Sequence, residues 1–223
     1  MTVSIIIPLF NKESTVGQAI ESALAQTGKA DVVVVNDGST DGSYNIAKAY
    51  GSAINLVSQE NRGLSAARNC GILATDSTFY VPLDADDWLE PGFVEQTLPL
   101  MQDASVGAVI AAEWLEPEHR YQIAPTSVGL RDEMLRNCLP QTALYRRAAY
   151  DQTPGYCEEL PAFEDWNMWL HLLKRGWHVA RVHDALFHYR IAAGSMLTAP
   201  GRRSSEDLYQ QIKQLHPDLW GEQ

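Results

Sequence analysis

Residues 32–42, Val-Val-Val-Val-Asn-Asp-Gly-Ser-Thr-Asp-Gly, join a run of β-branched residues to a cluster of turn-forming residues. The valines fit a strand buried on both faces, because β-branched side chains pack well on a pleated sheet. The Asn, Asp, Gly and Ser that follow favour a tight turn. This stretch therefore predicts one unit of an α/β sheet, a buried strand that ends in a polar loop.

The same unit recurs on both sides of this stretch. Short apolar runs predict further strands at residues 3–7, 54–57 and 79–83. Patterns with three- and four-residue spacing predict helices from Ser14 or Thr15 to residue 24, from the end of the turn to about residue 50, and over 64–74. Strand–helix alternation implies right-handed crossovers, so we expect an α/β fold with a Rossmann-like, mostly parallel sheet flanked by helices.

The second half of the chain is less regular. Its apolar runs predict strands at residues 106–112, 142–145, 179–182 and 186–189. Its helical patterns lie near Pro91 and at residues 130–138, 165–175 and 204–215, with Gly176 closing the third. Periodicity is otherwise weak over residues 113–140. No repeat or linker divides the chain, so we expect a single domain.

Composition excludes several classes of function. The chain has 223 residues, is 45% hydrophobic and carries a formal net charge of −11. It therefore has enough apolar residues for a core and lacks the basic footprint of a nucleic-acid-binding protein. No apolar window reaches the length of a bilayer span, so any membrane contact is expected to be peripheral. Three cysteines without metal-ligand spacing suggest reduced thiols and a cytoplasmic location.

Polar side chains collect where the predicted strands end. They are Asn11 and Glu13, Asp37, Glu60 to Arg62, and Asp84 to Asp87. In open α/β sheets ligands bind beyond the carboxyl ends of the strands, so these loops predict a binding site. In the last of them, Asp84-Ala85-Asp86-Asp87, three carboxylates in four residues offer hard oxygen ligands for Mg²⁺ or Mn²⁺. The alternative is a solvated loop whose acids cap the next helix.

Five segments together carry a family resemblance. In chain order they are SIIIPLFN (4–11), VNDGSTD (35–41), NRGLSAARN (61–69), LDADD (83–87) and EDW (164–166). Their order and spacing resemble the family 2 glycosyltransferases, the large inverting group with the GT-A fold. The resemblance implies one GT-A domain over residues 1–223. Within it, residues 1–112 would bind the nucleotide sugar, 113–200 would hold the acceptor and catalytic residues, and 201–223 would form a C-terminal helix.

The resemblance also implies a donor site and a metal. Asp37 would bind the nucleobase, Arg68 the base or diphosphate, and Asp84 the ribose and sugar. Asp86 would hold Mn²⁺ or Mg²⁺, with Asp87 as a further candidate ligand. The remaining donor-site residues would be Pro8, Phe10, Asn11, Glu13 and Ala85. A divalent ion suits this chemistry because the leaving nucleoside diphosphate gains negative charge as the glycosidic bond breaks.

Glu164-Asp165-Trp166 would supply the acceptor side. Asp165 is expected to act as the general base that takes the proton of the acceptor hydroxyl. Glu164 and Trp166 would contact the acceptor, and we expect Trp169 to pack in the core. The alternatives are that Asp165 is a helix-start acid, favoured there by the helix dipole, and that Trp166 is also a core residue.

One segment departs from the family pattern. Relatives often carry a metal-binding His two residues beyond a Tyr-Arg pair, and here that position is Ala192. His188 is the candidate replacement ligand, with His183 as a second choice. The Gln-x-x-Arg-Trp signature of processive synthases is missing as well. We therefore expect transfer of single sugars in polysaccharide biosynthesis, from a nucleotide sugar (UDP first) to a glycan, lipid-linked or protein acceptor; the oligomeric state is not predicted.

Two other functions fit parts of the pattern. A sugar-phosphate nucleotidyltransferase would also use carboxylates and a metal, but residues 8–18 lack the Gly-rich basic loop that holds a triphosphate. A catalytically inactive nucleotide- or glycan-binding module is favoured by Ala192. Retention of Asp37, Asp84, Asp86 and Asp165 together argues against it.

Overall fold

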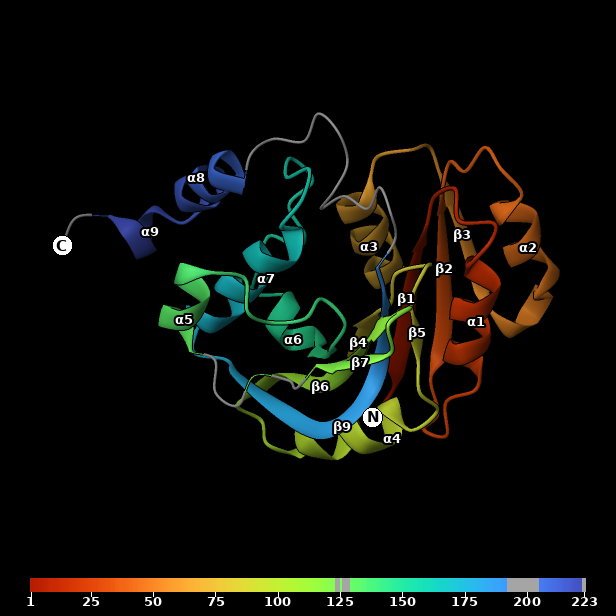
Figure 1. The fold of residues 1–223 in the computed structure, drawn as a ribbon, viewed down its shortest axis with the longest axis horizontal. Coiled ribbons are helices and arrows are strands. Elements are labelled where there is room, and N and C mark those ends of the chain that lie inside the picture. Colours follow the sequence, from red (N-terminus) through yellow and green to blue (C-terminus); the bar gives the residue numbers. More distant parts are fainter. Residues whose placement is uncertain (123–124, 126–128, 192–204, 222–223) are drawn as a thin grey trace.

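The computed structural model describes residues 1–122, 125, 129–191 and 205–221. Within these residues one sheet runs through the molecule in the order β3-β2-β1-β4-β8-β6-β9-β5, with β7 paired to β6. Figure 1 shows α1 and α2 on the outer side of the N-terminal strands, and α5 to α9 gathered over the C-terminal part. The predicted α/β fold, a sheet flanked by helices, is confirmed.

The N-terminal half is the parallel part of the sheet. Its strands are β1 (Val3–Leu9), β2 (Asp31–Asp37), β3 (Asn55–Gln59) and β4 (Phe79–Pro82), and the pairs β1–β2, β2–β3 and β1–β4 are all parallel. The connecting helices are α1 (Val16–Leu24), α2 (Ser43–Ala49) and α3 (Leu64–Leu73), with a 3₁₀ turn at Gly51–Ala53.

Alternate residues of these strands face different helices. Ile5 and Ile7 of β1 belong to the core cluster that includes α1, whereas Ile6 lies in the cluster that includes α3. Helix α3 lies very close to the sheet, because a Cβ added to Gly71 would come within 2.4 Å of Ile6 Cγ2 and 3.0 Å of Val35 Cγ2. This close approach sets the position of Arg68, one turn earlier on the same helix.

The C-terminal half is mixed. Its strands are β5 (Trp88–Leu89), β6 (Val106–Glu116), β7 (Arg120–Gln122), β8 (Leu144–Arg146) and β9 (His178–Arg190). Only β6–β9 is parallel among the pairs described here; β4–β8, β6–β8, β6–β7 and β5–β9 are antiparallel. The helices are α4 (Phe93–Thr97), α5 (Leu130–Leu135), α6 (Arg147–Tyr150) and α7 (Glu164–Leu173), with a 3₁₀ segment at Leu98–Gln102.

Several predicted boundaries were wrong. Residues 178–190 form one long strand and not two short ones, because β9 stays paired with β6 through irregular register near Ile110 and Ala112. Helix α5 ends at Leu135 and not at residue 138. The short elements β5, β7 and α6 had no periodic signal, since two to four residues are too few to show one. Gly176 does follow α7 with a φ of 84°, as expected for a residue that ends a helix.

The C-terminal helices cover α5 and α7. They are α8 (Ser205–Leu215) and α9 (Pro217–Trp220). Ile212 of α8 packs with Leu170 and Trp166 in a third hydrophobic cluster. Across the described part of the chain, no helix combines the length and the apolar character needed to cross a membrane.

Candidate functional site

A cavity of about 1040 Å³ opens beyond the carboxyl ends of β1, β2 and β4. One wall consists of strand-end loops and includes Phe10, Asp37 and Asp86. Another wall consists of residues 137–142 and the first turn of α7. The predicted site residues that line this cavity are Pro8, Phe10, Asp37, Arg68, Asp84, Ala85, Asp86, Asp87, Glu164 and Asp165.

The loop after β4 presents three carboxylates, each with a different partner. Asp84 Oδ1 accepts a hydrogen bond from Arg68 Nη2 at 2.6 Å. Asp86 Oδ2 lies 2.5 Å from Lys12 Nζ. Asp87 is buried, and its Oδ1 accepts from the backbone N–H of Arg190 at 2.8 Å. Burial raises the pKa of Asp87 well above its usual range, and repulsion from Asp84 adds to the shift.

Arg68 joins the two walls of the cavity. Its side chain is 1% exposed and donates to Asp84 on one side and to Glu164 Oε1 at 2.5 Å on the other. Burial alone opposes the charge, but the two ion pairs outweigh it and raise the pKa of Arg68. The guanidinium also lies 5.4 Å from the centre of the Tyr156 ring. Arg68 is therefore always charged, and its guanidinium is paired mainly with carboxylates of the protein itself.

Asp37 shapes the loop that follows β3. Its Oδ1 accepts hydrogen bonds from Gln59 Nε2 at 2.7 Å and from the Arg62 N–H at 2.9 Å, and its Oδ2 accepts from the Gly63 N–H at 2.8 Å. A carboxylate has about four acceptor sites, and these hydrogen bonds use three of them. About one acceptor site of Asp37 is therefore left for a ligand. The neighbouring Gly38 has a φ of 71°, and a Cβ there would lie 2.8 Å from Asn61 N. This turn therefore requires glycine.

Asn11 and Glu13 differ from the prediction, because neither lines the cavity. Asn11 Oδ1 accepts from the Thr40 N–H at 2.8 Å, and Glu13 Oε2 accepts from the Gly42 N–H at 2.7 Å. Both side chains therefore hold the first turn against the second. They affect the site by fixing the position of the backbone. Lys12, which stands between them, lines the cavity.

Asp165 lies in the first turn of α7, half-buried at the cavity wall. Its Oδ2 accepts from Asn137 Nδ2 at 3.0 Å and its Oδ1 from the Trp166 N–H at 2.8 Å. Burial raises the pKa of Asp165 to about 6, and repulsion from Glu164 adds to this. Burial likewise raises the pKa of Glu133, behind it, to about 8. Asp165 is thus deprotonated at neutral pH and still has the basicity that proton abstraction needs.

Two further predicted site residues lie outside the cavity lining. Trp166 is 5% exposed, donates from Nε1 to the Glu133 carbonyl at 2.6 Å and stacks on Tyr209. It packs α7 against α5 and α8, so the alternative interpretation, a core residue, is correct. Trp169 is 0% exposed, as predicted. His188 is also buried, and both ring nitrogens lie against glutamates and not against Asp86.

A sequence model of the Glycosyl transferase family 2 matches residues 4–160. The chain belongs to glycosyl transferase family 2. The uncharacterized glycosyltransferase RP339 of Rickettsia prowazekii is 27% identical over 98% of this chain and 70% of its own length. Glycosyltransferase GlyA of Streptococcus pneumoniae is 40% identical over 42% of this chain, and that match spans 14% of GlyA.

Solved structures of glycosyltransferases share the fold. S. aureus TarS 1–349 in complex with UDP-GlcNAc superposes with a TM-score of 0.80 at 20% identity, covering 96% of this chain and 65% of that one. Glucosyl-3-phosphoglycerate synthase from Mycobacterium tuberculosis, in complex with Mn²⁺, UDP and glucosyl-3-phosphoglycerate, superposes with a TM-score of 0.66 at 21% identity, covering 97% and 79%. This family 2 chain therefore has the GT-A fold.

In this family 2 chain, the carboxylates of the Asp84–Asp87 loop are suitable ligands for a divalent metal. Carboxylate oxygens are the ligands that Mg²⁺ and Mn²⁺ prefer. Asp86 already holds a cationic group, the ammonium of Lys12, on its cavity side. The family position for a metal-binding His, Ala192, lies outside the described residues. His183, the second choice, is exposed and lies next to Arg181.

Sequence reasoning missed three residues of the site. Lys12 was treated as part of a polar turn, Arg190 as part of the Tyr-Arg pair and Asn137 as part of a short helix. Lys12 and Arg190 contact the Asp84–Asp87 loop, as Arg68 does, and Asn137 holds Asp165. Lys12 had a detectable signal, because it stands between two residues already assigned to the donor site.

Proposed function

We propose that this chain carries the catalytic domain of an inverting glycosyltransferase. It moves one sugar from a nucleotide sugar, in the first place a UDP-sugar, to the hydroxyl of an acceptor. The observation that carries the proposal is that the carboxylates of Asp86 and Asp165 line the same cavity. An inverting transfer needs a leaving group on one side of the sugar and a base on the other, and these two carboxylates would serve those two roles.

The donor wall would hold the nucleotide. The free acceptor site of Asp37 suits an N–H of the base, and the half-exposed ring of Phe10 lines the same end of the cavity. A Mg²⁺ or Mn²⁺ ion held by Asp86, with Asp87 or Asp84 beside it, would offset the charge of the diphosphate. Lys12 and Arg190 would add positive charge there, because both already lie against the loop.

Asp165 would act on the acceptor. The N–H groups of Asn137 and Trp166 hold its carboxylate in place. The proton of the acceptor hydroxyl would pass to an Asp165 oxygen as the acceptor oxygen attacks the anomeric carbon. Arg68 couples this end of the site to the donor end, because it bonds Glu164, the residue before the base, and Asp84 of the donor loop.

Residues around Asp165 favour a neutral acceptor that is rich in hydroxyl groups. Asn137 Oδ1 and Gln141 Oε1 are buried and have no hydrogen-bond partner among the described residues. Both residues line the cavity, as does Thr142. Hydroxyl donors of a sugar would satisfy these oxygens. The Asp165 carboxylate, which has no cationic partner in hydrogen-bond contact within the described part of the chain, would repel an anionic acceptor at this end.

The test is calorimetric titration of UDP with and without Mn²⁺, followed by a panel of UDP-sugars. We expect UDP binding that depends on Mn²⁺ and is lost in Asp86→Asn. The matched control is Asp103→Asn, which removes an acid of an exposed turn. Binding of GDP or dTDP in place of UDP would change the donor assignment. Failure of all three nucleotides to bind would refute the proposal.

A further inference from the structure

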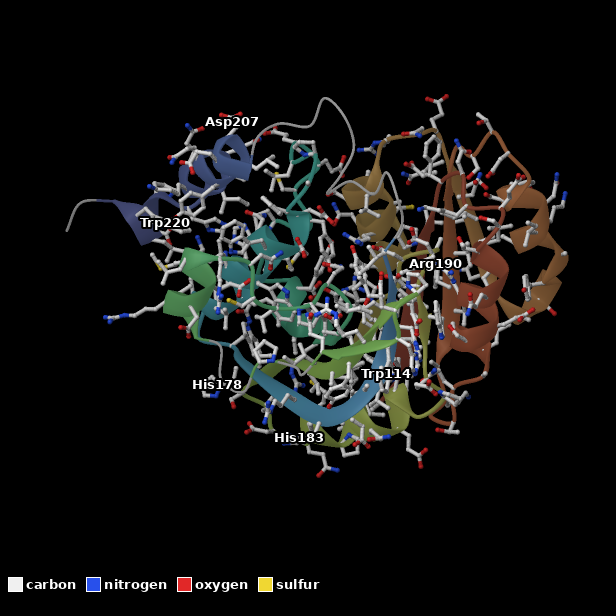
Figure 2. All side chains as sticks on the ribbon, in the orientation of Figure 1. Trp114, His178, His183, Arg190, Asp207 and Trp220 are labelled. Atoms are coloured by element: carbon white, nitrogen blue, oxygen red, sulfur yellow. The ribbon has the colours of Figure 1, made fainter. Side chains whose placement is uncertain are left out.

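A stack of rings lies on the face of β9 that points away from the cavity. Phe187 and Tyr189 line the cavity, and His188 between them does not, as strand alternation requires. His188 is the register partner of Trp88 on β5 and of Trp114 on β6. The centroids of the His188 and Trp88 rings are 4.6 Å apart and the rings are nearly parallel, at 12°. Trp114 lies where β6 runs beside β7 and β9 (Figure 2).

The turn between β6 and β7 brings a second histidine to this stack. The His119 ring lies on Trp114 with centroids 4.3 Å apart and planes 3° apart. His119 has a φ of 50°, a left-handed conformation that is uncommon for a residue with a side chain. The surrounding structure therefore holds this ring in a specific position next to the other histidine.

One glutamate oxygen lies between the two imidazoles. Glu116 Oε1 is 2.9 Å from His119 Nδ1 and 3.0 Å from His188 Nδ1. The three ligand atoms all lie within 4.8 Å of one another. In a tetrahedral zinc site with bonds near 2.0–2.1 Å the ligand atoms are about 3.3 Å apart. Two imidazole nitrogens and a carboxylate oxygen are an established donor set for zinc, so both chemistry and spacing fit.

The far nitrogen of His188 supplies an independent observation. His188 Nε2 is 2.7 Å from Glu90 Oε1. A histidine that binds a metal commonly donates its other ring N–H to a carboxylate, which fixes the tautomer. A neutral imidazole has only one N–H. Without a metal, its other ring nitrogen would therefore direct a lone pair at a lone pair of a carboxylate oxygen. The metal-free alternative is a doubly protonated imidazolium.

We infer that Glu116, His119 and His188 form a second metal site, separate from the Asp84–Asp87 loop, that binds a divalent transition-metal ion of the zinc type. Glu90 orients His188 from behind. The His119 side chain is 63% exposed, so a water molecule has access to the fourth coordination position. None of these residues lines the cavity, which makes this a positioning site and not a catalytic one.

A series of side-chain contacts links this second metal site to the Asp84–Asp87 loop. Trp88 lies against His188 on one side, and the Arg190 guanidinium lies 4.9 Å from the centre of its ring. Arg190 in turn donates to the Asp86 carbonyl and to Asp87. An ion that clamps β6 to β9 would therefore restrict the loop that carries the metal motif. This role in donor binding rests on the proposed function, whereas the metal site itself does not.

The experiment titrates Zn²⁺ calorimetrically into the purified chain without nucleotide and records the visible absorption of the Co²⁺-loaded protein. We expect one ion per chain and Co²⁺ bands typical of a low-coordinate site. His119→Gln and Glu116→Gln should each weaken binding at least tenfold, and Glu90→Gln should weaken it about 10- to 100-fold. The control is His178→Gln, which removes an exposed histidine from the other end of β9. It should leave binding unchanged.

Different results separate this site from the donor site. Asp86→Asn should keep the Zn²⁺ site and lose Mn²⁺-dependent UDP binding. If Asp86→Asn abolishes Zn²⁺ binding while His119→Gln does not, the ion belongs to the donor loop and the inference is wrong. No binding of Zn²⁺ or Co²⁺ to the folded wild-type chain would overturn the inference equally.

Discussion

Replacing Arg68 by Met should destabilise the fold strongly. The substitution keeps most of the side-chain volume and removes a cation that two carboxylates share. The Glu164 side chain is 8% exposed and would stay buried without a counter-charge. Breaking a buried ion pair by removing one partner costs about 3–5 kcal/mol. For a chain of this size that corresponds to a fall in Tm of about 10 °C.

Thermal and urea unfolding at pH 7, followed by circular dichroism, would measure this change. The control is Arg62→Met, because the Arg62–Glu158 pair is also in hydrogen-bond contact, at 2.8 Å, but its side chains are 63% and 40% exposed. Exposed pairs contribute less than about 1 kcal/mol. Arg68→Met combined with Glu164→Gln should recover part of the loss, since the amide needs no counter-charge.

The reasoning is refuted if Arg68→Met costs no more than Arg62→Met. It is also refuted if the double variant is no more stable than Arg68→Met alone. Either result would mean that water reaches the guanidinium and that the two walls of the cavity are not coupled through it.

Four more predictions address packing, catalysis, pH dependence and the metal. Gly71→Ala should cost about 1–3 kcal/mol in urea unfolding, because its Cβ would lie 2.4 Å from Ile6 Cγ2; the control Gly17→Ala, whose Cβ would meet nothing closer than 3.6 Å, should be neutral or stabilising. Asp165→Asn should lower kcat by about 10²- to 10⁴-fold while UDP still binds, and unchanged turnover would exclude it as the base. In the wild type, kcat/KM should rise with pH through about 6, because burial raises the pKa of Asp165 to about 6 and only its deprotonated form accepts a proton; a flat profile from pH 5 to 8 would contradict this. Removing divalent ions with EDTA should lower the UDP affinity of the wild type to that of Asp86→Asn. If EDTA lowers the UDP affinity of Asp86→Asn by the same factor as that of the wild type, the ion is not bound at Asp86.

The N-terminal half was predictable from its sequence because three of its four strands, β1, β2 and β4, are buried on both faces. Val32 to Val35 are all buried in β2, so an unbroken apolar run was a sufficient signal. The carboxyl ends of such parallel strands share one edge of the sheet. Strand order alone therefore brought Asp37 and Asp84 to the same cavity, as predicted.

The second half was less predictable because its contacts are tertiary. Residues 129–141, for example, pack against partners elsewhere in the chain, and the backbone carbonyl of Glu133 accepts a hydrogen bond from Trp166 Nε1. The position of Trp166 beside Asp165 gives no local sign of whether the tryptophan faces a ligand or the core. Likewise, His188 is separated by 72 residues from Glu116 and by 98 from Glu90, so no short motif joins them.

The two walls of the cavity are built so differently that they tolerate sequence change to different extents. On the donor side, Gly38 must keep a left-handed turn and Asp37 must satisfy three donors, so most substitutions there break several bonds at once. On the other side, residues 137–142 present side chains from an irregular segment that few ladder bonds constrain. In the proposed function, substitutions in that segment would change which hydroxyls are recognised and would leave the nucleotide end intact. The same scaffold would thereby take a different acceptor without a change to its donor chemistry.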